Sequence, residues 1–143
     1  MKIRRIKITL GAMLAAVGIL TIAPAWAHHS FAAEFDDKKP IKMRGKVTKV
    51  ELINQHSWIH IDVKGPDGSV VNWAIEGGSP NALFRLGFNK ESLPVGTEIV
   101  VEGYQAKDGA NRAVGANLTF TNGKRLFLGG SAPGATPGSD EGK

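Results

Sequence analysis

The sequence contains no cysteine among its 143 residues. This absence excludes disulfide bridges, metal sites built from thiolates and catalysis by a cysteine nucleophile. It also excludes a lipoprotein, because lipid attachment needs a cysteine at the cleavage point of the export signal. Long apolar runs are scarce as well, since the main one, residues 8–22, is shorter than the roughly 20 residues of a membrane-spanning helix.

This apolar run forms the middle of a predicted secretory signal peptide, residues 1–27. Four cations precede it, Pro24 interrupts it, and Ala25-Trp26-Ala27 is a small-x-small cleavage motif. Cleavage after Ala27 on the general secretory (Sec) route predicts a periplasmic or secreted protein with no stable membrane insertion after cleavage. An uncleaved N-terminal anchor is the alternative.

The mature chain also lacks a surplus of positive charge. The whole chain has 18 Lys and Arg residues against 13 Asp and Glu residues, but four of the cations lie within residues 1–27. Removal of the signal leaves 14 cations and 13 acids. A nucleic-acid-binding protein needs a clustered basic face, so we exclude nucleic acid as a partner.

The mature chain has room for one domain with a single core. We predict an N-terminal arm at residues 28–39, a folded domain at 40–128 and a disordered tail at 129–143, which is rich in Gly, Pro and small polar residues. Phe31 and Phe35 in the arm are four residues apart. They fit either one turn of helix or two anchors of an extended segment.

Alternation of apolar and polar residues predicts five to six strands in the folded domain. The expected strands cover residues 43–53, 57–63, 69–75, 97–105, 112–121 and 124–128. The apolar positions change parity between Val47 and Val50, which indicates a β-bulge near Thr48 and Lys49.

A short helix is expected between the third and fourth strands. Ser79 is a favoured N-cap, Pro80 suits the first helical position, and residues 81–86 supply one or two turns. This order predicts a mostly all-β fold, a small OB-like Greek-key β-barrel of five to six strands. A β-sandwich is the alternative. Residues 76–81 are interpreted as a tight bend rather than an anion-binding loop, because they contain no Lys or Arg.

Five segments that cover nearly all of the mature domain carry a family pattern. They are His28-His29-Ser30-Phe31, Gly45-Lys46-Val47-Thr48-Lys49-Val50-Glu51, Asn54-Gln55-His56-Ser57-Trp58, Trp73-Ala74-Ile75-Glu76-Gly77-Gly78-Ser79-Pro80-Asn81 and Gly103-Tyr104-Gln105-Ala106-Lys107-Asp108-Gly109. Together they resemble domain-of-unknown-function family 6152, a group of small exported bacterial proteins. The family commonly has a proline where this chain has Gln55. The resemblance supports export and the domain boundaries, and it implies no activity.

All four histidines of the sequence lie in two places, so a metal site is the first functional hypothesis. Cleavage after Ala27 makes His28 the first residue, whose α-amine and imidazole together can chelate a metal such as Cu(II). A third nitrogen from His56, or from His29 or His60, would complete a copper site of the histidine-brace type. His56 is favoured because it lies in a turn.

Geometry restricts this ligand set. His56 and His60 are separated by four residues of strand, about 13 Å, so they cannot share one ion if the strand is regular. A carboxylate from the arm could fill a further oxygen position, and the candidates are Glu34, Asp36 and Asp37. The alternative is an ordinary polar surface, in which His60 pairs with a polar group on a neighbouring strand.

The second functional hypothesis is a binding module without a metal. It would hold an unidentified protein partner or small ligand on the barrel face around Trp58, which lies opposite the core-facing positions. Trp73 shares the parity of Val71 and Ile75 and is expected in the core. Neither a nucleophile elbow nor a carboxylate pair points to an enzyme, so we propose no catalytic residue.

Overall fold

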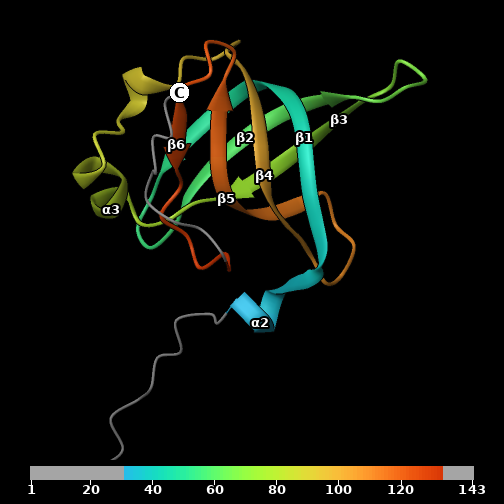
Figure 1. Cartoon of the computed structure of the whole chain (residues 1–143), viewed down its shortest axis with the longest axis horizontal. Coiled ribbons are helices and arrows are strands. Elements are labelled where there is room, and N and C mark those ends of the chain that lie inside the picture. The colour runs from blue at the N-terminus through green and yellow to red at the C-terminus, as the bar shows by residue number, and fades with distance from the viewer. Residues whose placement is uncertain (1–30, 134–143) are drawn as a thin grey trace, which may run out of the picture.

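The computed structural model of the chain describes residues 31–133. Within this range lie two groups of three consecutive strands, with short helical segments before the first group and between the two (Figure 1). In chain order they are α2 (Phe31–Glu34), β1 (Phe35–Leu52), β2 (Ser57–Lys64), β3 (Val70–Glu76), α3 (Pro80–Arg85), the 3-10 helix η1 (Lys90–Ser92), β4 (Glu98–Ala106), β5 (Arg112–Phe120) and β6 (Arg125–Phe127).

Five of these strands close into a ring through backbone pairing. β1 pairs antiparallel with β2 and β4, β2 pairs with β3, and β4 pairs with β5. A short parallel contact between residues 74–76 of β3 and 112–114 of β5 closes the ring, and β6 pairs with β5. The order β1-β2-β3-β5-β4 is that of the OB-like Greek-key barrel. The predicted fold class is therefore confirmed, and one sheet replaces the two that a β-sandwich requires.

β1 pairs with β4 along its first part, residues 35–46, and with β2 along its second part, residues 46–52. Its register with β2 shifts between Val47 and Lys49, which confirms the predicted bulge. Gly45 allows the close approach of the two strands, because a Cβ at this position would come within 2.9 Å of the Asp62 carbonyl oxygen.

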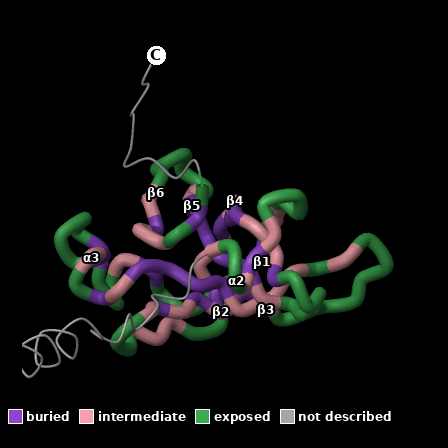
Figure 2. The backbone as a smooth tube through the Cα atoms, turned by 90° about the horizontal axis from the view of Figure 1, so that it is seen from below, coloured by how far each residue is buried: buried purple, intermediate pink, exposed green. Residues whose placement is uncertain are grey.

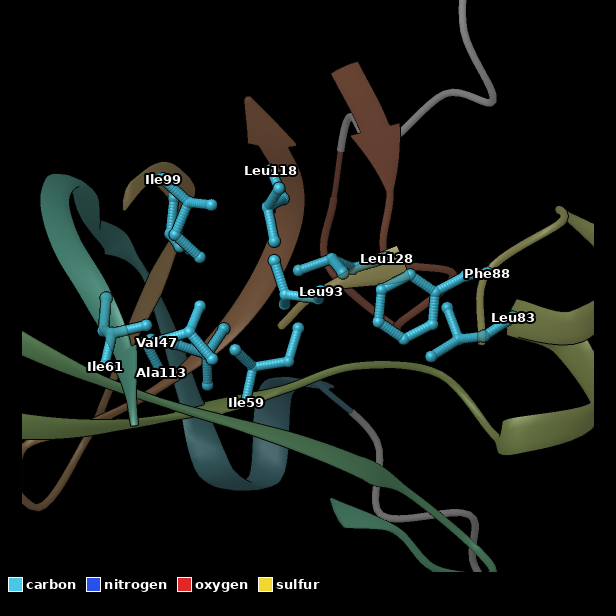
Figure 3. Close-up of a cluster of buried hydrophobic side chains, with 12 residues drawn as sticks. Val47, Ile59, Ile61, Leu83, Phe88, Leu93, Ile99, Ala113, Leu118 and Leu128 are labelled. Carbon is cyan, nitrogen blue, oxygen red and sulfur yellow. The ribbon is translucent and has the colours of Figure 1, made fainter. Parts of the chain in front are cut away.

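The ring encloses the main hydrophobic core. Its buried side chains come from all five ring strands, from the connection between β3 and β4, and from the residue after β6. They are Val47, Ile59, Ile61, Ile75, Leu83, Phe88, Leu93, Ile99, Val101, Ala113, Leu118 and Leu128. Figure 3 shows Leu83 and Phe88 reaching toward Leu128 from the helical connection between β3 and β4. This connection covers one end of the core. Trp73, expected in the core, packs against it while partly buried.

The start of α3 follows the predicted capping pattern. The Ser79 hydroxyl oxygen accepts a hydrogen bond from the Ala82 amide at 3.3 Å, and Pro80 opens the helix. Just before it, the Gly77 amide donates to the Ser57 carbonyl at 2.8 Å, and the Gly78 carbonyl accepts from the Ser57 amide at 2.9 Å. These bonds extend the backbone pairing of β2 and β3 beyond Glu76, the last residue of β3, and hold the start of β2 next to residues 77 and 78.

A second apolar cluster lies on the outer face of the ring, and we name it the arm cluster. Its members are Phe31, Phe35, Tyr104, Ala106, Val114, Ala116 and Ala132. The ring of Phe31 lies 6.1 Å from that of Phe35 and meets that of Tyr104 edge-on at 5.3 Å. Residues 31–35 thus combine a turn of helix, α2, with the first residue of β1. Figure 1 shows this turn below the ring, and Figure 2, which views the molecule from below, shows it in front of the strands.

None of the helices within residues 31–133 is long and apolar enough to cross a membrane. The predicted signal peptide at residues 1–27 lies outside the described residues, as do the first three residues of the predicted arm and positions 134–143 of the predicted tail. The predicted domain boundaries therefore stay predictions.

Candidate functional site

His56 lies in the turn between β1 and β2, directly before Ser57. The peptide bond between Asn54 and Gln55 in this turn is cis. The amide and the carbonyl of Ser57 both form hydrogen bonds with the backbone that follows Glu76, so the turn is held next to the end of β3. The fold thereby brings the His56 imidazole to the last side chain of that strand.

His56 and Glu76 form a close pair. Nδ1 of His56 lies 2.8 Å from Oε1 of Glu76, and the side chains are 36% and 9% exposed, respectively. A carboxylate on Nδ1 favours the tautomer with its proton there and leaves the lone pair of Nε2 for another partner. In metal sites, the same contact orients the ligating ring and raises its basicity. His56 is thus a suitable metal ligand through Nε2.

A hollow of about 430 Å³ borders the His56 turn, the start of α3 and the segment that follows β6. The residues that line it are Asn54, Gln55, His56, Gly78, Ser79, Ala82, Gly129, Gly130 and Ser131. The three glycines carry no side chain, so a group that approaches His56 from this side meets backbone and small polar residues.

His60 has a different setting. Its Nε2 lies 2.8 Å from Oε2 of Glu51, whose other carboxylate oxygen lies 2.7 Å from Nζ of Lys49. The hydrogen bond from Lys49, followed by that from His60, lowers the pKa of Glu51. The imidazole thus belongs to a polar network with an ammonium group close by, which repels a metal cation. This is the kind of pairing that the polar-surface alternative predicts for His60.

Trp58 lies between these two histidine–carboxylate pairs. It pairs with Glu51 on β1 and with Glu76 on β3, and its side chain is half-buried on the outer face. A carboxylate therefore flanks the indole on each neighbouring strand.

Cross-strand pairing brings the arm cluster close to Glu76. Tyr104 pairs with Val114, and Val114 pairs with Glu76, so the three side chains share the outer face. Neighbouring strands are about 4.8 Å apart, which separates Tyr104 from Glu76 by about 10 Å. A Cβ on Gly130, in the wall of the hollow, would lie 3.4 Å from Cγ2 of Val114. The hollow and the arm cluster therefore adjoin.

His28 and His29 lie outside the described residues. Phe31, in the arm cluster, follows His28 by three residues, which span up to about 10 Å when extended. Within residues 31–133, no group of three or more His, Cys, Asp or Glu side chains is arranged to hold a metal ion. Of the predicted oxygen ligands, Glu34 pairs with Arg112 at 3.2 Å, and Asp36 accepts a hydrogen bond from the Lys38 amide.

The alternation of apolar residues does not single out Glu76 as the partner of His56. A signal is nevertheless present, because the turn from Gly65 to Ser69 sets the register of β2 and β3. If the two strands are paired residue by residue outward from this turn, Trp58 lies opposite Glu76, next to the His56 turn. The burial of Glu76 comes from the contact between β3 and β5, which no local pattern reveals.

The comparison with known families rests on one match. No curated protein sequence matches the chain. The model of DUF6152, described as a family of unknown function, matches residues 16–116, which is more than half of the 143-residue chain. The matched region includes the predicted N-terminal histidines, the His56 turn and Glu76. The resemblance seen in the sequence is confirmed: the chain belongs to DUF6152, a family of unknown function.

Proposed function

We propose that the mature protein is an exported, periplasmic copper-binding protein. His28 supplies two nitrogens, its α-amine and its imidazole, and Nε2 of His56 supplies the third. His29 is a further candidate ligand, whereas His60, the remaining candidate from the sequence, is not assigned to the site. The observation that carries the proposal is the contact of 2.8 Å between His56 Nδ1 and the buried Glu76 carboxylate.

The two described histidines differ in ways that favour His56. Glu76 holds Nδ1 of His56 and leaves the outer nitrogen, Nε2, for a metal. Glu51 holds Nε2 of His60, so a metal there would have to bind Nδ1, the nitrogen nearer the backbone. The Lys49 ammonium on Glu51 adds an unfavourable charge at the His60 position.

The position of the arm cluster supports the involvement of His28. Phe31 contacts Tyr104, which lies about 10 Å from Glu76 across the outer face, and the His56 imidazole contacts Glu76. The three residues from Phe31 back to His28 span up to about 10 Å. The span of this segment is therefore comparable with the separation of Tyr104 and Glu76, which supports His28 as a ligand.

Three neutral nitrogen donors suit Cu(II) and leave positions on the ion open to other molecules. Binding or delivery of copper is the role that fits this donor set. Each donor must be deprotonated to bind, so protons compete with the metal for all three nitrogens. We therefore expect copper affinity to fall as the pH is lowered.

The test starts with mass spectrometry of the exported protein, which should begin at His28. Competition titrations with Cu(II) then compare this form with one that carries an additional N-terminal Ala, and with His56→Ala. We expect each change to weaken binding about tenfold or more. His60→Ala is the matched control and should bind like the unmodified mature protein.

Equal binding by the mature and Ala-extended forms would exclude the amine as a ligand. A loss with His60→Ala in place of His56→Ala would move the site to the other histidine. Failure of every form to bind copper would overturn the proposal and favour a protein or small-ligand partner on the face around Trp58.

A further inference from the structure

The hairpin of β2 and β3 has an edge with no neighbouring strand. Within the described part of the chain, β3 pairs with β2 along residues 70–76 but with β5 only along residues 74–76. Residues 70–73 therefore have a strand on one side only, and we call them the free edge. Figure 1 shows this end of the hairpin extending beyond the ring, and Figure 2 shows the same extension from below. A strand of another molecule can thus reach the free edge from outside the ring.

The pairing of β3 with its neighbours determines which backbone groups point outward along the free edge. In an antiparallel pair, the amide and carbonyl of alternate residues face the partner strand. The Ala74 amide donates to the Asn111 carbonyl at 3.0 Å, on the side opposite β2. By this alternation, the amides and carbonyls of Val70 and Asn72 also point away from β2. They form a row of donors and acceptors that a further strand can pair with.

The free edge lacks the features by which proteins prevent their sheets from pairing. Such features are prolines, charged side chains and β-bulges. The free edge has the sequence Val-Val-Asn-Trp, and its register with β2 contains no shift. Val70 and Val71 are 59% and 37% exposed. By contrast β6, which ends the strand order of the described sheet, has only three residues and begins with Arg125. The composition of the free edge therefore favours pairing.

We infer that two copies of this protein form a dimer by antiparallel pairing of their free edges. A two-fold axis beside Val71 puts Val70 of one copy opposite Asn72 of the other, which gives four hydrogen bonds between the copies. The two Val71 side chains then face each other, with their Cβ atoms about 5 Å apart. The free edge contains no charged residue, so its pairing with a second copy brings no like charges together. A second copy is thus the partner that satisfies all of the outward-facing groups.

The dimer is expected to be weak, because the four residues of the free edge span only about 13 Å. Interfaces that bury less than about 1,200 Å² belong to weak and transient complexes. We expect a dissociation constant on the order of 100 µM. Glu76, which contacts His56, lies at the opposite end of β3, so the dimer leaves the proposed copper site uncovered. The inference therefore does not depend on the proposed function.

Sedimentation velocity of the metal-free mature protein, from about 10 µM to about 1 mM, tests the dimer. We expect the sedimentation coefficient to rise with concentration. Val71→Lys places two ammonium groups opposite each other at the axis, and Val70→Pro removes an outward-facing amide without removing a bond to β2. Each change should raise the dissociation constant about tenfold or more. Val95→Lys is the matched control, at a 71% exposed valine outside β3, and should dimerise like the unmodified protein.

A charge swap tests the register of the two copies. Val71→Glu should be monomeric alone, whereas an equimolar mixture with Val71→Lys should dimerise, because opposite charges then meet at the axis. Thermal unfolding identifies the variants that fold, and Val70→Pro decides the outcome if Val71→Lys does not fold. An unmodified protein that stays monomeric throughout would overturn the inference, as would a dimer that persists in the folded free-edge variants. Since no metal is present, either result would leave the proposed function unaffected.

Discussion

Glu76→Gln is the substitution that examines the role of the carboxylate in the site. The glutamine side chain keeps the size of glutamate and a carbonyl oxygen that can accept the proton of His56 Nδ1, but it removes the negative charge. Glu76 is 9% exposed, so solvent screens this charge little. Loss of such a partner typically lowers metal affinity about 10- to 100-fold, or about 1.4 to 2.8 kcal/mol. We expect Glu76→Gln near the lower limit and Glu76→Ala near the upper.

Stability should respond differently from affinity. A buried charge is costly to desolvate, so replacing it with a neutral isostere can be nearly neutral for folding. The assay therefore combines a Cu(II) competition titration of the mature protein at fixed pH with metal-free thermal unfolding of the same samples. Glu51→Gln is the matched control, because Glu51 makes the corresponding 2.8 Å contact with His60.

Two results would refute the reasoning. In the first, Glu76→Gln binds copper as tightly as the unmodified protein while His56→Ala does not, which would make the carboxylate irrelevant to the ligand. In the second, Glu51→Gln causes an equal loss, which would mean that the effect comes from general charge and not from orientation of His56.

Two further predictions concern the ring itself. In Gly103→Ala the new Cβ would lie 2.0 Å from the Val114 carbonyl oxygen, so β4 and β5 must separate. We expect the free energy of unfolding to fall by about 1–3 kcal/mol and the melting temperature to fall by about 4–8 °C per kcal/mol. An unchanged melting temperature would contradict this prediction. The pKa of Glu51 is lowered from its ordinary 4.5, mainly by Lys49 and then by His60. The contribution of the Glu51 carboxylate to folding stability is therefore present above the unfolded-state pKa and is lost as the pH falls through the folded-state pKa. An NMR titration of the Glu51 carboxyl should give a midpoint below 4.5 that rises in Lys49→Ala, and a midpoint unaffected by this change would rule out Lys49 as the main cause.

Much of the fold could be predicted from the sequence because strand alternation, bulges and helix caps depend on interactions between residues close together in the chain. Alternation located the strands except for the first part of β1, residues 35–42, which was expected to belong to the arm or to precede the first strand. The parity change located the bulge after Val47, and the capping preference of Ser79 located α3. The closure between residues 74–76 and 112–114 joins segments far apart in sequence, and nothing in either segment alone specifies it.

The residues of the candidate site also differ in whether a local sequence pattern or a contact between distant segments reveals them. His56 stands out in the sequence because histidines are few and it lies in a turn. Glu76 does not stand out, because its value as a partner depends on being buried by ring closure beside that turn. The arm cluster likewise depends on Tyr104 and Val114, which become neighbours only in the folded ring.

The most direct measurement is a crystal structure of the processed protein loaded with one equivalent of Cu(II). We predict a single ion bonded, at about 2 Å, to the amine and imidazole nitrogens of His28 and to Nε2 of His56, with Glu76 on Nδ1. An ion bound at His60, or at the N-terminus with His56 uncoordinated, would contradict the account.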